Sequence, residues 1–199
     1  MKIDTHQLTW YMQDVCMHAL GAQLEFKSLL TRLADVETQQ SRLVWFHLTS
    51  FLHHTAMISK FVRPISKHKV AVARGKALRA ALDVKDGSDV LPRHARDNVE
   101  HFDERIDRWL EGASSYTILE IVLPNRAAYD YLRVADKRVK RILIADSLIF
   151  VSEAKDSSKF ELSLRPVYEE VERIGRAADG WMGLSSPYEY IHPGHLRVG

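Results

Sequence analysis

Between residues 8 and 33 the chain carries an uninterrupted stripe of apolar side chains with the spacing of a packed helix. The stripe alternates steps of four and three residues, and its members are Leu8, Met12, Val15, Ala19, Ala22, Phe26, Leu29 and Leu33. This spacing places all of them on one face of an α-helix, which other apolar surface must cover. We therefore expect a long helix that begins near residue 5, with Asp4 or Thr5 as its N-cap.

A second stripe with the same alternation lies between residues 44 and 62. Its members are Val44, Leu48, Phe51, Thr55, Ile58 and Val62. Apolar residues also occur on the other faces of this segment, so it is predicted to be the most buried helix. Pro64 ends the helix, because proline disfavours helical geometry in the residue before it and has no backbone N–H.

Two further segments have helical patterns. Residues 67–83 are rich in alanine and precede a predicted turn at Asp86-Gly87. Beyond Pro92, a third apolar stripe consists of Ala95, Val99, Phe102, Ile106 and Trp109. Helices that share a repeat close to 3.5 residues pack against one another as a bundle. The expected fold class is therefore mainly α, with an antiparallel four-helix bundle as the first domain over residues 1–113.

The pattern changes after residue 113. Segments rich in β-branched and large apolar residues alternate there with polar turns, and they span residues 116–123, 142–144, 148–151 and 160–164. They predict a small antiparallel β-sheet or a pair of hairpins. Pro166 opens a last predicted helix that runs to about residue 178. We expect residues 114–182 to form an α+β extension packed on the bundle, followed by a flexible tail over residues 183–199.

Composition narrows the class of protein. A hydrophobic content of 46% and a charged content of 27% are typical of globular chains. The single cysteine, Cys16, excludes an internal disulfide and a cysteine-based zinc site. The net charge of +2 is too small for a general polyanion binder. Because the sequence has no run of 18 apolar residues and no signal-peptide pattern, we expect a cytoplasmic protein with no membrane partner. No cofactor is predicted.

Charge is distributed unevenly along the chain. Residues 38–82 contain eight lysines and arginines and no acidic residue, whereas residues 83–111 contain nine acidic residues. One interpretation is that a basic helix packs against an acidic one. The other is that the basic segment grips the phosphates of RNA. In that case the predicted phosphate-binding residues are Lys60, Arg63, Lys67 and Lys69.

Several familiar catalytic patterns are missing from the sequence: a glycine-rich phosphate loop, GxSxG, HExxH and the spacing of a di-iron bundle. Three histidines, His47, His53 and His54, occur on the second predicted helix. They are candidate metal ligands, although the sequence places no carboxylate close to them. The alternative is that they are partly buried side chains with hydrogen-bonded nitrogens.

One segment stands out, Arg96-Asp97-Asn98-Val99-Glu100-His101, on the helix of the third stripe. Arg42 and Arg63 also precede a histidine by five residues, but Leu43 and Pro64 follow them, whereas the polar Asp97 follows Arg96. The segment resembles the motif of the HEPN superfamily, whose nucleases carry an arginine, four to six residues and then a histidine. The resemblance covers about residues 5–112.

The resemblance implies a helical bundle that cleaves RNA without a metal. A 2′-hydroxyl attacks the adjacent phosphate and leaves a cyclic phosphate end. Arg96 would stabilise charge on the phosphoryl oxygens, and His101 would move the proton, since imidazole titrates near neutral pH. Asp97 lies four residues before His101 and would orient its ring.

The positions of the two main residues also predict an oligomeric state. Arg96 and His101 are about 140° apart around one helix, so one copy does not easily hold a phosphate between them. Dimerisation builds the site in the nucleases of this superfamily, and the resemblance implies a homodimer here.

Two other functions remain open at this point. The first is a non-catalytic dimeric interaction module that binds a protein partner through the C-terminal extension. The second is a metal-dependent hydrolase or transferase that uses His47, His53 and His54.

Overall fold

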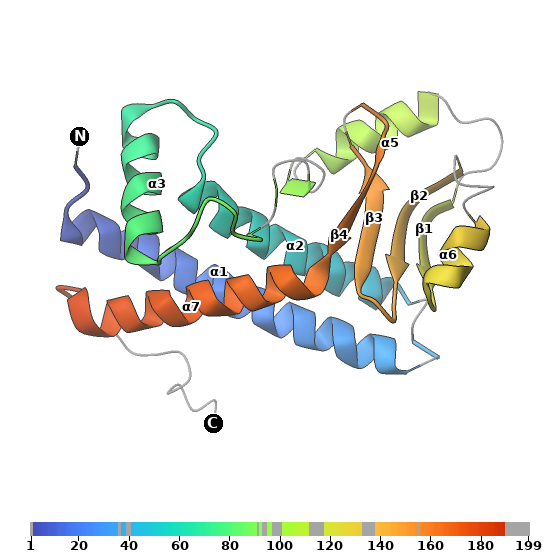
Figure 1. Cartoon of the computed structure of the whole chain (residues 1–199), viewed down its shortest axis with the longest axis horizontal. Helices are drawn as coiled ribbons and strands as arrows, with labels where there is room; N and C mark the ends of the chain where they lie inside the picture. Colours follow the sequence, from blue (N-terminus) through green and yellow to red (C-terminus); the bar gives the residue numbers. More distant parts are fainter. Residues whose placement is uncertain are drawn as a thin grey trace.

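The computed structural model describes residues 2–35, 37–38, 41–90, 92, 95–96, 101–111, 118–132, 138–154 and 156–189. Within these residues the chain is mainly helical, with a small mixed β-sheet towards its C-terminal side (Figure 1). Helices α1 (Thr5–Ala34) and α2 (Arg42–Val62) are joined by a short connection and pack along their length. Helix α7 (Leu164–Ser185) packs along α1 as well, so α1 contacts a long helix on two sides.

The first predicted stripe is confirmed as the buried face of α1. Seven of its eight residues are buried, from Met12 to Leu33, and Leu8 is partly buried. Asp4 caps the helix: its side chain accepts a hydrogen bond from the Gln7 amide at 2.8 Å, and the Gln7 side chain accepts one from the Asp4 amide at 3.2 Å. This reciprocal pair satisfies two amides that the first turn of the helix leaves without an intrahelical partner.

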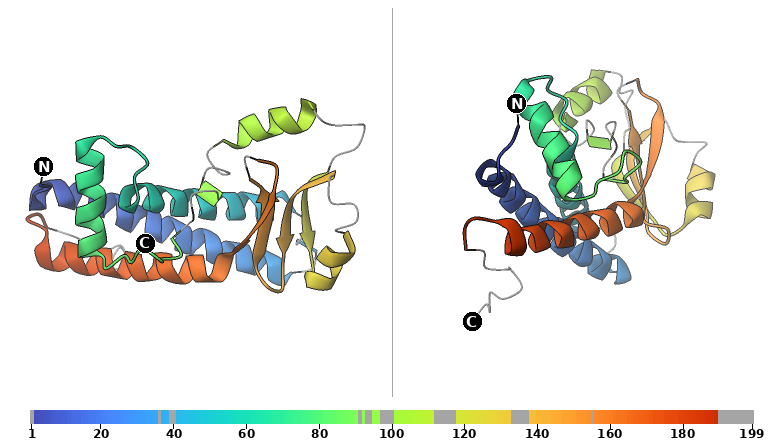
Figure 2. Two further views of the ribbon diagram at one scale, coloured as in Figure 1. Left: turned by 45° about the horizontal axis from the view of Figure 1, so that its top comes forward. Right: turned by 60° about the vertical axis from the view of Figure 1, so that its left-hand side comes forward.

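The four-helix arrangement predicted for residues 1–113 is not confirmed. Besides α2, the long helix that packs along α1 is α7, which comes after the sheet in the chain. The buried residues of α7 share one core with those of α1 and α2 (Figure 2). The two helices approach closely at Gly175, where an added Cβ would lie 2.8 Å from the Cβ of Ala19. The predicted C-terminal extension therefore supplies part of the helical layer, and α7 runs to Ser185 instead of residue 178.

Helix α3 (Lys69–Ala81) is short and stands across the C-terminal end of α2 (Figure 1). Helix α5 (Phe102–Glu111) lies beside the sheet, away from the layer of long helices (Figure 2). In the third predicted stripe Ala95 is buried, but Phe102, Ile106 and Trp109 are only partly buried, and Val99 lies outside the described residues. This stripe therefore does not serve as the core face of a bundle helix.

The sheet has the strand order β1-β2-β3-β4. Its strands are β1 (Ile118–Leu123), β2 (Val139–Ile144), β3 (Ile149–Glu153) and β4 (Lys159–Ser163), close to the predicted positions. The prediction of an antiparallel sheet is wrong in one respect, because β1 and β2 are parallel. The short helix α6 (Arg126–Leu132) lies between them in the chain, so the connection crosses back instead of turning as a hairpin.

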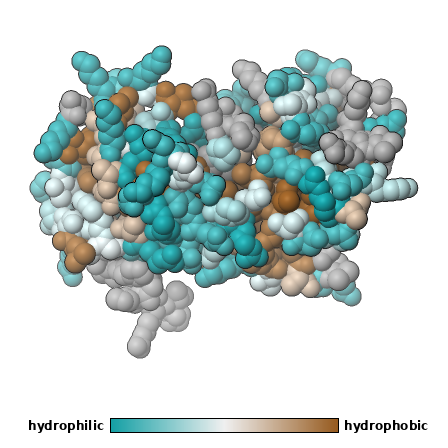
Figure 3. All heavy atoms as spheres, in the orientation of Figure 1, coloured by the Kyte–Doolittle hydropathy of each residue, from teal (hydrophilic) through white to brown (hydrophobic). Residues whose placement is uncertain are grey.

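Both faces of the sheet are covered. Phe150 and Leu162 belong to the core shared with the long helices, whereas Ile142 and Val151 belong to a second apolar cluster with Tyr129 of α6. The face seen in Figure 3 is hydrophilic over the middle of α7, and hydrophobic residues gather over the strands. Among the described residues, no helix has the length and apolar character needed to cross a bilayer.

Candidate functional site

His101 lies immediately before the first residue of α5, where its carbonyl accepts a hydrogen bond from the Arg105 amide at 3.3 Å. Its side chain is 55% exposed. The ring nitrogen Nδ1 lies 3.1 Å from a carboxylate oxygen of Glu104, one turn along the helix. The imidazole is therefore accessible to a ligand and is oriented by a neighbouring carboxylate.

Arg96 has a different environment from the surface position predicted for it, because only 3% of the residue is exposed. Its guanidinium is directed at the end of α2, where Nη1 donates to the carbonyl oxygen of Arg63 at 3.3 Å and to the hydroxyl of Ser59 at 3.4 Å. Arg96 thus fixes the helical turn before α5 to α2. Asp97, predicted to orient His101, lies outside the residues that the structure describes.

Arginine side chains donate hydrogen bonds to the backbone carbonyls at the C-terminal end of α2. Besides Arg96, Arg79 donates to the carbonyl of Val62 at 2.7 Å, and Arg74 donates to the carbonyls of Lys60 at 3.1 Å and Phe61 at 3.4 Å. The last carbonyls of a helix lack intrahelical partners and carry partial negative charge, so cationic donors stabilise them. Part of the basic segment at residues 38–82 therefore binds the protein's own backbone.

The four residues predicted to bind phosphate fall into two groups. Arg63 donates from Nη2 to the carbonyls of Lys85 at 2.9 Å and Asp86 at 2.8 Å, and Lys60 is half-buried. Lys67 precedes α3 by two residues, Lys69 is the first residue of α3, and both are exposed. The structure does not gather all four side chains into one exposed cluster.

Two arginines follow His101 on the same face of α5. Arg105 and Arg108 come four and seven residues later, which on an α-helix places all three side chains within about 60° of one another. Arg105 is buried, and Arg108 is exposed. An imidazole and two guanidinium groups therefore form one row along α5.

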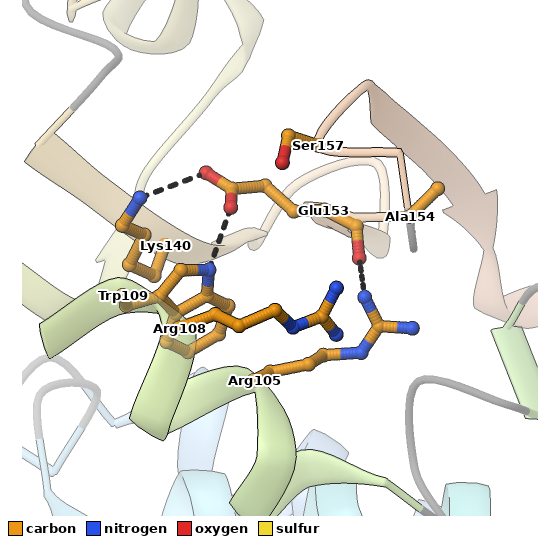
Figure 4. A pocket seen from close by; sticks show the side chains of 7 residues that line it. All are labelled: Arg105, Arg108, Trp109, Lys140, Glu153, Ala154 and Ser157. Carbon is orange, nitrogen blue, oxygen red and sulfur yellow. Dashed lines mark hydrogen bonds and ion pairs between the residues drawn. The ribbon is translucent and has the colours of Figure 1, made fainter. Parts of the chain in front are cut away.

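This row leads to a cavity between α5 and the sheet (Figure 4). Its volume is about 380 Å³. Its lining residues come from α5, β2, β3 and the turn after β3, and they are Arg105, Arg108, Trp109, Lys140, Glu153, Ala154 and Ser157. The lining thus contains three cationic side chains and one carboxylate, which makes the cavity electropositive.

Glu153 connects the walls of the cavity. Its carboxylate accepts hydrogen bonds from the indole Nε1 of Trp109 at 2.6 Å and from Nζ of Lys140 at 3.1 Å. The ammonium of Lys159 lies 3.6 Å from the same carboxylate. The backbone carbonyl of Glu153 accepts a hydrogen bond from Arg105 at 2.8 Å (Figure 4). One buried residue thereby fixes three of the side chains that line the cavity.

A buried arginine on β2 holds the first turn of α5 against the sheet. The guanidinium of Arg141 lies 3.8 Å from the ring centroid of Phe102 and 5.3 Å from that of Trp45, and it pairs with Glu120. Burial lowers the pKa of the Arg141 guanidinium to about 10. Cation–π contacts and the ion pair offset the cost of that burial.

The histidines of α2 are not gathered into a metal centre. His47 pairs with Glu25 of α1 through an Nδ1–carboxylate distance of 2.7 Å, and the Nδ1 atoms of His54 and His18 lie 2.9 Å apart. Within the described ranges, no group of three histidine, cysteine or acidic residues is placed to hold a metal ion. Burial, more than the neighbouring imidazoles, lowers the pKa of both His18 and His54.

Comparison of the chain with protein-family models, with curated proteins and with solved structures gave no match.

The cavity is not among the sites that the sequence predicts. The sequence feature that points to it is the position of Arg105 and Arg108, four and seven residues after His101. This spacing places the three side chains on one face of α5. Lys140 and Glu153 carry no such signal, because they meet through the pairing of two strands.

Proposed function

We propose that this protein is an RNA-binding homodimer of the HEPN type that cleaves RNA without a metal ion. The observation that supports this best is the row on α5, an exposed His101 followed on the same face by Arg105 and Arg108. An imidazole next to guanidinium groups suits phosphodiester cleavage, because the reaction needs proton transfer and stabilisation of developing negative charge.

In the proposed reaction the 2′-hydroxyl oxygen of RNA attacks the neighbouring phosphorus. The bond from phosphorus to the 5′-oxygen of the next nucleotide breaks, leaving a 2′,3′-cyclic phosphate. The 2′-hydroxyl loses a proton and the leaving 5′-oxygen gains one, so no net proton is consumed. His101 transfers a proton in this exchange. Arg108 supplies positive charge along the strand, and Arg96 acts as a positioning residue, because its guanidinium binds the end of α2.

The dimer has a candidate surface on α1. Trp10, Met17, Leu20 and Leu24 are exposed, and their spacing places them on the face opposite the buried stripe. Exposed apolar faces of this kind mark interaction sites. Leu24→Glu is expected to convert a dimer into monomers in sedimentation velocity experiments. Leu184→Glu, at an exposed site near the end of α7, is the matched control and should leave self-association unchanged.

Cleavage of a labelled single-stranded RNA in the presence of a chelator tests the catalytic proposal. Wild-type protein is expected to give products with 2′,3′-cyclic phosphate ends, and His101→Ala to lose about 100-fold or more in rate, the usual size of a general acid–base contribution. His6→Ala removes an exposed histidine at the other end of the fold and serves as the control. Equal cleavage by folded wild-type and His101→Ala proteins would refute the assignment.

The same α1 face also supports a second candidate function, a non-catalytic dimeric interaction module. A protein that forms dimers sensitive to Leu24→Glu, but neither binds nor cleaves RNA, would favour that function.

A further inference from the structure

The cavity between α5 and the sheet has the features of a binding site for an anion. Three cations and a single carboxylate line it, so its formal charge is positive. We infer that this cavity binds the phosphate group of a nucleotide. Its place in an RNA strand, as the subsite for a second phosphate of the strand bound at His101, rests on the proposed function.

The carboxylate of Glu153 does not oppose this binding. It accepts hydrogen bonds from Trp109 and Lys140, and the Lys159 ammonium lies 3.6 Å away, so two cations neutralise its charge. The role of this residue in the cavity is to hold the Lys140 ammonium, the Arg105 guanidinium and the Trp109 ring in place. A site whose charged groups and aromatic ring are already fixed loses less conformational entropy when a ligand binds.

The two arginines supply the geometry that a phosphate requires. Arg105 is buried, and its Nη1 donates to the carbonyl of Glu153 at 2.8 Å, which fixes its guanidinium at the wall. The guanidinium of Arg108 extends into the cavity from the next turn of α5 (Figure 4). A planar guanidinium group donates two parallel hydrogen bonds to two oxygens of one phosphate. Partial burial of the site strengthens that attraction.

The size and lining of the cavity favour a nucleotide over inorganic phosphate. A volume of about 380 Å³ is within the range of small-molecule sites and exceeds what a single phosphate fills. The indole of Trp109 adds an aromatic wall, and Ser157 adds a hydroxyl from the turn after β3. Basic residues combined with an aromatic side chain are typical of proteins that bind single-stranded nucleic acid.

The cavity also lies at a suitable place relative to His101. Arg108 follows His101 by seven residues, a rise of about 10.5 Å along one face of α5. A strand with one phosphate at His101 can therefore extend along the helix and place another of its phosphates in the cavity.

Isothermal titration calorimetry with adenosine 5′-monophosphate, adenosine and inorganic phosphate tests this inference. We expect the monophosphate to bind the wild-type protein at least about tenfold more tightly than either of the others. Arg108→Gln, at an exposed position, should weaken monophosphate binding by about tenfold or more, the effect of losing one charge-assisted contact. Arg176→Gln, which removes an exposed arginine from α7, is the matched control and should bind like wild type.

Two results would overturn the inference. One is adenosine or inorganic phosphate binding as tightly as the monophosphate, and the other is an unchanged affinity in folded Arg108→Gln. Failure of the proposed function gives a different pattern. In that case RNA is not cleaved, or His101→Ala cleaves it normally, while monophosphate binding still depends on Arg108.

Discussion

Replacement of Arg96 by alanine should destabilise the protein, whatever it does to activity. The buried guanidinium donates to Arg63 and Ser59, and its removal leaves the Arg63 carbonyl without this donor. Hydrogen bonds from charged groups contribute about 1.5–3 kcal/mol each. Since these two bonds are long, at 3.3 and 3.4 Å, we expect a combined loss of about 2–3 kcal/mol, less than two charge-assisted bonds of ordinary length would contribute.

Urea denaturation and thermal unfolding measure this loss. For a chain of 199 residues, about 2–3 kcal/mol corresponds to a decrease in Tm of about 5–10 °C. Arg96→Met keeps most of the apolar stem and should retain part of the stability, which separates packing from hydrogen bonding. His101→Ala, at an exposed position, should stay within about 0.5 kcal/mol of wild type. A free energy of unfolding of Arg96→Ala within about 0.5 kcal/mol of wild type would refute the structural role assigned to this arginine.

Two further predictions concern helix packing and pH. Gly175→Val should lower the free energy of unfolding by about 1–3 kcal/mol, because its Cβ would overlap Ala19, whereas Gly180→Ala has open space and should raise it by up to about 1 kcal/mol. Because their pKa values are lowered in the folded state, His18 and His54 bind protons more readily in the unfolded chain. The contribution of these two histidines to the free energy of unfolding should therefore be fully present above about pH 6.5 and fall towards pH 5. The double variant His18→Gln/His54→Gln should flatten this pH dependence, as measured by urea denaturation at several pH values. A double variant whose free energy of unfolding depends on pH as strongly as that of the wild type contradicts the assignment.

The long helices were predictable because their signal is local. The stripes of α1 and α2 repeat every three or four residues, and all but Leu8 of their members are buried. Pro64 lies two residues after the end of α2, as expected from its missing N–H. The four strands were located for the same reason, since short apolar segments between polar turns indicate strands without reference to the rest of the chain.

The errors concern contacts between distant parts of the chain. No local pattern indicates that α7 packs along α1, or that α6 makes β1 parallel to β2. The burial of Arg96 was missed because an arginine in a charged segment is ordinarily on the surface, and the carbonyls that bind it belong to another helix. The electropositive cavity depends on the meeting of Lys140 and Glu153 from two strands.

The arginines at the end of α2 also affect how this helix opens. A helix terminus normally frays one residue at a time, because its last carbonyls have no intrahelical donor and can form hydrogen bonds with water instead. Here those carbonyls are bound by side chains of α3 and of the turn that contains Arg96. The last turn of α2 therefore unwinds only when both neighbouring segments detach with it. Its amides should exchange with solvent as slowly as those in the middle of the helix, and one cooperative unit includes all three segments.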